Sequence, residues 1–119
     1  MLENELKSVK DYKEKIQELY KYLAIEEKEI KFSNLDETSQ KPDFWNDQQN
    51  AQKILKQMNE LKWWVDMWKG LDKKADDIIE LIELAAMEED SSMEAEINAD
   101  IEKLKTTIVT GKQIGRAHV

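Results

Sequence analysis

A long apolar seam without a proline is the feature that most constrains this chain. No proline follows Pro42, and beyond residue 50 apolar residues recur at steps of three and four. The seam consists of Ala51, Ile54, Met58, Leu61, Val65, Trp68, Leu71, Ala75, Ile78, Ile82 and Ala85. Such steps place side chains on one helical face. The pattern predicts a single helix over about residues 46–88, with a small slip of the seam at 65–71.

Shorter apolar stripes flank this helix. The stripe before it consists of Leu2, Leu6, Val9, Tyr12, Ile16, Leu19 and Leu23, and the stripe after it of Met93, Ile97, Ile101, Leu104 and Ile108. We expect helices over residues 3–23 and from about 92 to Val109. Between the first helix and the long helix, a further short helix is indicated by Ile25, Phe32 and Leu35. It should end by about Gln40, because Pro42 disfavours helical geometry at Lys41. We expect a bend near Ala24–Ile25, where no capping residue stands.

Two capping boxes are predicted at the helix starts. Asn46 with Gln49 would cap the long helix, and Ser91 with Glu94 would cap the last one. A long helix, a short polar connection and a shorter helix form a helical hairpin. The predicted fold is therefore all-α, a long antiparallel helical hairpin with the N-terminal helices packed on it as a coiled-coil-like bundle.

Composition excludes several classes of protein. The 119 residues are room for one domain, and the net charge of −8, from 26 acidic and 18 basic residues, argues against direct binding of nucleic acid. There is no cysteine, hence no disulfide and no thiolate chemistry. No apolar stretch approaches the roughly 18 residues of a membrane span, and the charged N-terminus does not read as a signal peptide. We expect a soluble, cytoplasmic protein without a membrane partner.

Two clusters of residues are candidate sites. Trp63, Trp64 and Met67, with the seam residue Trp68, make the long helix apolar almost all round. We expect the N-terminal helices to cover this girdle, with a partner-protein surface as the alternative. The acidic cluster consists of Glu88, Glu89, Asp90, Glu94 and Glu96; it lacks the ligand spacing of a calcium loop and is interpreted as a solvated connection.

Two further features, Gly111–Lys112 and His118, do not indicate a binding or catalytic site. Gly111–Lys112 lacks the rest of a phosphate-binding loop. His118, the sole histidine, has no second histidine or cysteine with which to form a metal site or a triad. The sequence therefore predicts no catalytic, cofactor-binding or metal-binding residue, and no cofactor.

The stretch Lys41-Pro-Asp-Phe-Trp-Asn-Asp47, followed by Ala51 and the long helix, resembles the helical N-terminal domain of the bacterial peptide chain release factor 2 family. The likeness continues through Ile79-Glu-Leu-Ile-Glu-Leu-Ala-Ala-Met-Glu-Glu-Asp90 to Thr110-Gly-Lys112, and covers about residues 5–112.

This resemblance implies translation termination at UGA and UAA codons. It also implies that the domain faces the stalk base of the ribosome and the class II release-factor GTPase. The family's Gly-Gly-Gln motif and codon-reading tripeptide lie farther downstream and do not occur in these 119 residues. We therefore expect docking rather than enzymatic activity, and no functional residue is carried over. The alternative is a structural coiled-coil scaffold that binds a partner helix along the Ala51–Ala85 seam.

The last residues differ from the rest. Ile114-Gly-Arg-Ala-His-Val119 resembles the translation of a sequencing-library adapter. We expect residues 1–112 to form the N-terminal helical domain and residues 113–119 to be a non-native tail.

Overall fold

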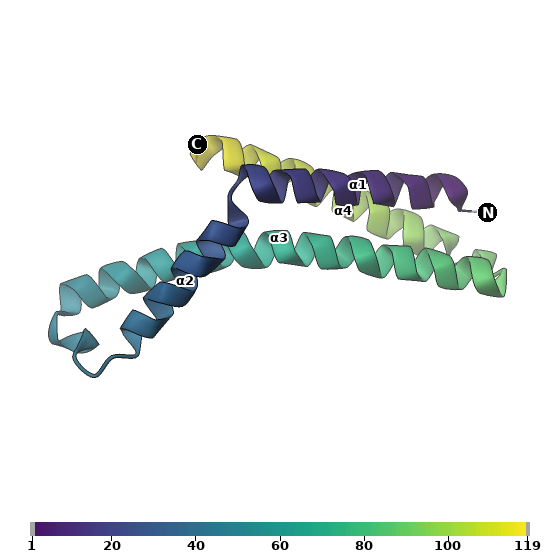
Figure 1. Cartoon of the computed structure of the whole chain (residues 1–119). Coiled ribbons are helices and arrows are strands. Elements are labelled where there is room, and N and C mark those ends of the chain that lie inside the picture. The colour runs from purple at the N-terminus through teal and green to yellow at the C-terminus, as the bar shows by residue number, and fades with distance from the viewer. Residues whose placement is uncertain (1, 119) are drawn as a thin grey trace. The chain divides into compact units, whose positions relative to one another are not determined.

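The computed structural model describes the backbone of residues 2–118 and the side chains of residues 2–112. Its elements are the α-helices α1 (Glu3–Tyr22), α2 (Ile25–Ser39), α3 (Gln48–Glu88) and α4 (Glu94–His118), with the 3-10 turns η1 (Phe44–Asn46) and η2 (Ser91–Met93) (Figure 1). The described part contains helices and no strand, which confirms the all-α fold class.

The chain divides into two compact units. The first unit comprises Met1–Leu19 and Lys69–Val119, and the second unit comprises Tyr20–Trp68. Helix α3 contributes to both, and the division falls between Trp68 and Lys69, within the predicted slip of the apolar seam.

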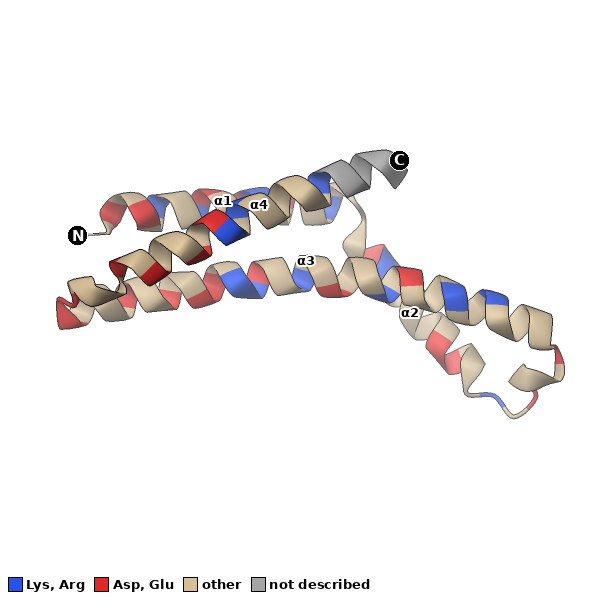
Figure 2. Ribbon diagram, turned by 180° about the vertical axis from the view of Figure 1, so that it is seen from behind, with Lys and Arg blue, Asp and Glu red and all other residues tan. Residues whose placement is uncertain are grey.

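In the first unit, the C-terminal half of α3 and α4 form the predicted antiparallel hairpin, and α1 lies along it (Figures 1 and 2). The predicted stripes supply the core. The buried residues of this unit are Leu2, Val9, Ile16, Leu19, Leu71, Ala75, Ile78, Ile82, Ala85, Ile97, Ile101, Leu104 and Ile108. Burying each large aliphatic side chain contributes about 1.5–3 kcal/mol, so apolar burial dominates the stability of this unit.

One ion pair joins α1 to α3 inside the first unit. The Lys13 ammonium donates a hydrogen bond to the Asp76 carboxylate. That bond raises the pKa of Lys13 above its ordinary value, while desolvation acts in the opposite direction and the nearby Asp72 and Asp76 charges add to the rise. The pair thus links α1 to α3 at the edge of the apolar core.

The second unit is a helical hairpin of α2 and the N-terminal half of α3. The break before α2 occurs where it was predicted: Ala24 adopts a left-handed conformation, with φ 54° and ψ 47°, and no side chain caps α2. The Lys28 ammonium donates to the Leu23 carbonyl, which precedes this break, at 2.7 Å. Helix α2 ends at Ser39, as expected from Pro42.

The predicted Asn46–Gln49 capping box is wrong. Asn46 belongs to the 3-10 turn η1, in which its backbone N–H donates to the Asp43 carbonyl at 3.0 Å. Asp47 caps α3 in its place, because its Oδ1 accepts the Asn50 N–H at 3.1 Å and its carbonyl accepts the Ala51 N–H at 3.0 Å. The tight η1 turn thus moves the helix start one residue later.

The predicted Ser91–Glu94 capping box is also wrong. Ser91 begins the turn η2, and Asp90 supplies the cap, since its Oδ1 accepts the Ser92 N–H at 2.9 Å. Helix α4 starts at Glu94 and continues to His118, beyond the predicted end near Val109. The tail predicted at residues 113–119 lies outside the residues whose side chains are described.

Candidate functional site

No side-chain cluster of the described residues is arranged for metal chemistry. Among them, no group of three or more His, Cys, Asp or Glu residues could hold a metal ion, and no polar or charged side chain of residues 2–112 is buried. Nor is any described helix long and apolar enough to cross a membrane. The candidate sites are therefore exposed surfaces.

The tryptophan girdle is covered unevenly. Trp68 is fully buried and Trp64 is half-buried, whereas Trp63 is 47% exposed. Within the second unit, the Lys28 ammonium of α2 lies over the Trp64 ring at 5.7 Å from its centroid, a cation–π contact. Trp63 packs edge-on against Trp64, with centroids 5.3 Å apart. Helix α2 thus covers one side of the girdle, as expected, and leaves the outer ring of Trp63 in solvent.

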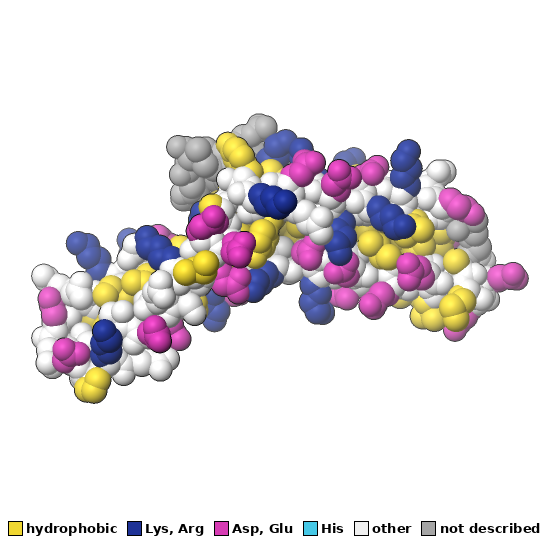
Figure 3. All heavy atoms as spheres, viewed as in Figure 1, with side chains coloured by type: hydrophobic (Ala, Val, Ile, Leu, Met, Phe, Trp, Pro, Cys, Tyr) yellow, Lys and Arg dark blue, Asp and Glu magenta, His cyan; other side chains and the backbone are white. Residues whose placement is uncertain are grey.

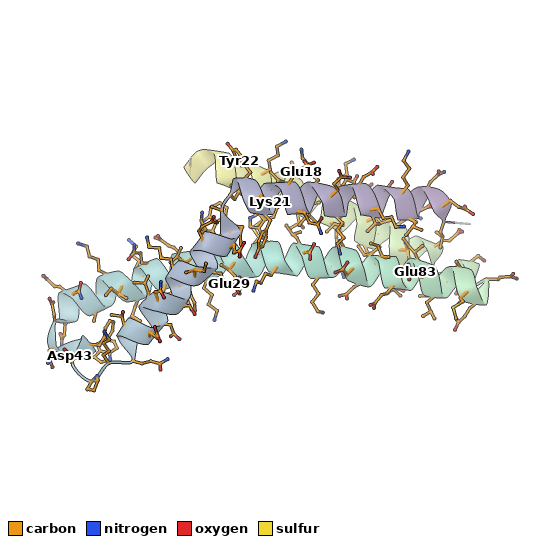
Figure 4. The ribbon with its side chains drawn as sticks, viewed as in Figure 1. Glu18, Lys21, Tyr22, Glu29, Asp43 and Glu83 are labelled. Carbon is orange, nitrogen blue, oxygen red and sulfur yellow. The ribbon has the colours of Figure 1, made fainter. Side chains whose placement is uncertain are left out.

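A second aromatic pair lies in the loop before α3. Phe44 is buried and anchors the loop, while Trp45 is 58% exposed and meets Phe44 edge-on at a centroid distance of 5.2 Å. Asp43, which precedes the pair, is labelled in Figure 4. Of the two aromatic residues, Phe44 is therefore the buried one and Trp45 the exposed one.

The acidic connection between α3 and α4 is a solvated turn with a defined hydrogen-bond pattern. Glu89 is exposed and has φ 51°, the left-handed region. The Asp90 N–H donates to the Ala85 carbonyl at 2.9 Å and the Glu89 N–H donates to the Ala86 carbonyl at 3.3 Å, which is the Schellman pattern of a helix C-terminus. Hydrogen bonds from the Ser92 hydroxyl and backbone N–H lower the pKa of Asp90. The Asp90 carboxylate therefore serves as the cap of η2.

Sequence reasoning missed an apolar pair beside this turn. Leu84 and Met87 on α3 are 45% and 83% exposed, respectively. They stand three residues apart and off the buried seam, so they share an outward face of the helix. Their exposure could have been predicted from the sequence, because neither Leu84 nor Met87 falls on the buried seam. Both residues lie in the Ile79–Asp90 segment, which was interpreted above only through its resemblance to the release factor family.

The Ala51–Ala85 seam itself is not an open binding surface. Ala51, Ala75, Ile78 and Ala85 are fully buried in this single chain. A scaffold that receives a partner helix along that seam would need those positions exposed.

Comparisons with known proteins agree with the fold and with the loop motif. The PCRF domain matches residues 28–116. Peptide chain release factor 2 of Nautilia profundicola is 30% identical over 84% of this chain and 27% of its own length. The same-named protein of Exiguobacterium sp. is 35% identical over 70% of this chain and 23% of its own, and that of Petrotoga mobilis is 32% identical over 91% and 29%.

The chain spans about a quarter of the length of these relatives. The match covers most of α2, all of α3 and nearly all of α4, and it includes the Pro42–Asp47 loop. The chain therefore belongs to the PCRF-domain family of peptide chain release factors, and its relatives are of the release factor 2 type.

Proposed function

We propose that this chain acts in translation termination as the N-terminal docking domain of a class I peptide chain release factor directed to UGA and UAA codons. The observation that carries the proposal is the likeness to proteins named peptide chain release factor 2 over most of this chain. In the proposal, codon reading and triggering of peptidyl-tRNA hydrolysis belong to the portion of the relatives that this chain does not span. The chain's own task is non-catalytic.

The proposed partners are the ribosome, at its stalk-base region, and the class II release-factor GTPase. Both proposed partners act in the cytoplasm, which is therefore the proposed location of this chain. Three features support docking: the helical hairpins, the exposed aromatic and apolar side chains of Trp45, Trp63 and Met87, and the net charge of −8. Acidic surfaces suit basic protein partners and speed their encounter.

The proposal assigns residues 1–112 to the domain and leaves residues 113–119 outside it. A protein ending at Lys112 should have the same affinity for its partners as the full chain. A loss of binding on this truncation would assign the last residues to the domain.

Cosedimentation with 70S ribosomes tests the function. The isolated chain should pellet with ribosomes, and release factor 2 of Exiguobacterium sp. should displace it. Added to ribosomes programmed with UGA and formyl-methionyl-tRNA, the chain alone should release no formyl-methionine. The absence of ribosome binding at low salt, or codon-dependent release by the chain alone, would contradict the proposal.

A further inference from the structure

The negative charge of this chain is concentrated at one end of the first unit. Residues 75–102 carry eleven acidic residues and no Lys or Arg: Asp76, Asp77, Glu80, Glu83, Glu88, Glu89, Asp90, Glu94, Glu96, Asp100 and Glu102. The other fifteen acidic residues of the chain are outnumbered by its 18 basic ones. The rest of the chain is therefore net positive, and this segment accounts for more than the whole net charge.

Figure 2 shows the same segregation in space. Red segments without blue ones occupy the last turns of α3 and the first turns of α4, whereas blue segments lie on α1, farther along α4 and on the rest of α3. Asp76 and Asp77, at the start of the segment, have ion-pair partners in Lys13 and Lys73. After Lys74, the next basic residue along the chain is Lys103. Most of the acidic end thus has no basic neighbour in its own helical turns.

The placement of these acids opposes the stability of α3. The C-terminal end of a helix carries partial negative charge, so acidic residues in the last turn destabilise the helix. Helix α3 has no basic residue in its last turn and ends on Glu88. A charge pattern that conflicts with local stability, and that packing does not require, is typical of a functional surface.

Exposed apolar side chains lie within this acidic field. Glu80, Glu83, Leu84, Met87 and Glu88 are all exposed and share the outward face of the last turns of α3, opposite the buried Ile78, Ile82 and Ala85. Glu83 is labelled on these turns in Figure 4, and Figure 3 shows apolar atoms at the surface between acidic side chains at this end. We call these five residues the acidic–apolar face.

We propose that the acidic–apolar face docks a basic, amphipathic protein segment, whose Lys or Arg side chains meet the three glutamates while its apolar side chains cover Leu84 and Met87. The inference rests on the proposed docking function and names the surface and the chemistry of its partner. Charge complementarity selects the occupant: nucleic-acid phosphates and anionic lipid head groups would be repelled. Methionine suits such a contact because its flexible thioether adapts to varied apolar partners.

A designed peptide tests the pairing directly. The probe is a fluorescein-labelled peptide of Lys and Leu at amphipathic helical spacing, and its anisotropy is followed as the chain is added. The probe should bind, and a peptide with the same lysines but Ser in place of Leu should bind more weakly. The Leu84→Ser/Met87→Ser variant should lower affinity for the first probe about tenfold, because these are its central apolar contacts.

The charge contribution is tested on the same probe. The Glu80→Gln/Glu83→Gln/Glu88→Gln variant should weaken binding and flatten its dependence on salt. Circular dichroism should show both variants folded, since all substituted side chains are exposed.

Matched control variants remove similar groups elsewhere. Ile30→Ser/Val109→Ser removes two other exposed apolar side chains, and a second control converts Glu26, Glu27 and Glu37, all exposed on α2, to Gln. Both controls should bind the probe like the parent chain. Equal losses in controls and test variants, or no loss in either test variant, would overturn the inference.

Two further measurements separate this inference from the proposed function. If the parent chain and the Leu84→Ser/Met87→Ser variant bind 70S ribosomes equally well, the docking function stands and the inference falls. If neither binds ribosomes, the docking function fails and the peptide titration alone decides the inference. A dimer in sedimentation that the same variant dissociates would assign the face to a second copy of the chain and overturn the inference.

Discussion

Glu89 directly follows α3 and has a backbone conformation that suits glycine, so replacing it with glycine should stabilise the protein. Its φ of 51° lies in the left-handed region, and the Asp90→Ala85 and Glu89→Ala86 backbone hydrogen bonds complete the turn. Glycine is the usual residue at this position because it has no Cβ to clash with the carbonyl oxygen. The side chain is exposed, so its replacement opens no cavity.

The expected gain is the balance of three contributions. Relief of the left-handed conformation is worth about 1–2 kcal/mol. Removal of a carboxylate from the negative end of α3 adds about 0.3–1 kcal/mol. The greater freedom of glycine in the unfolded chain takes back about 0.5–1 kcal/mol. Glu89→Gly should therefore raise the free energy of unfolding by about 1 kcal/mol.

Glu89→Ala serves as the matched control. It removes the carboxylate but retains a Cβ, so it should gain only the charge contribution, about 0.3–1 kcal/mol. Thermal unfolding followed by circular dichroism at 222 nm should place Glu89→Gly about 3–5 °C above the parent, and above Glu89→Ala. A Glu89→Gly protein that melts at or below Glu89→Ala would refute the assignment of strain to this turn.

Three other substitutions test separate parts of the fold. Gly70→Ala should stabilise α3 by about 1 kcal/mol in urea unfolding, because an added Cβ meets no atom within 4 Å; destabilisation would show a contact that the structure lacks. Asp47→Ala should cost about 1 kcal/mol, since it removes the cap on the Asn50 N–H, whereas Asn46→Ala should cost less, and the reverse order would restore the capping box. A double-mutant cycle of Lys13→Met with Asp76→Asn should give a coupling of about 0.5 kcal/mol, as both side chains are partly exposed. Because the folded-state pKa of Lys13 is raised, this contribution is present below its unfolded pKa and is lost as pH rises through the folded value; coupling unchanged at high pH would contradict the ion pair.

The helices could be predicted from the sequence because their apolar periodicity is strong. Most of the seam from Ala51 to Ala85, and the stripe around Ile97 and Leu104, form the buried core, whereas Ile54 and Leu61 are only partly buried. The break at Ala24 followed from the lack of a capping side chain, and the end of α2 followed from Pro42. These features depend on local geometry, which short spacings determine.

Helix starts were predicted less well, because adjacent residues compete to cap them. Asn46 and Ser91 both have capping side chains, but 3-10 turns take up these residues and leave the role to Asp47 and Asp90. A capping-box motif specifies only the separation of its two residues along the sequence. It does not show whether a tight turn precedes the helix. The cap of α3 lies one residue later than predicted, and α4 starts at Glu94, two residues after the predicted start at about residue 92.

The candidate surfaces, too, could be predicted only in part. Burial of Trp68 could be predicted because it continues the seam, whereas exposure of Trp45 and Met87 depends on which helix faces meet in three dimensions. The likeness of the Pro42–Asp47 loop to release factor 2 led to the family, which the PCRF match confirms. Composition alone would not have done so, since an acidic helical chain suits many functions.

A chimeric release factor tests the central claim most directly. Residues 1–112 of this chain would replace the matching N-terminal segment of release factor 2 from Exiguobacterium sp., and formyl-methionine release would be measured on ribosomes programmed with UGA. The account predicts that the chimera releases formyl-methionine at close to the parent factor's rate, and faster than a factor lacking the segment. A chimera no more active than the factor without the segment would contradict the claim that this chain is a release-factor docking domain.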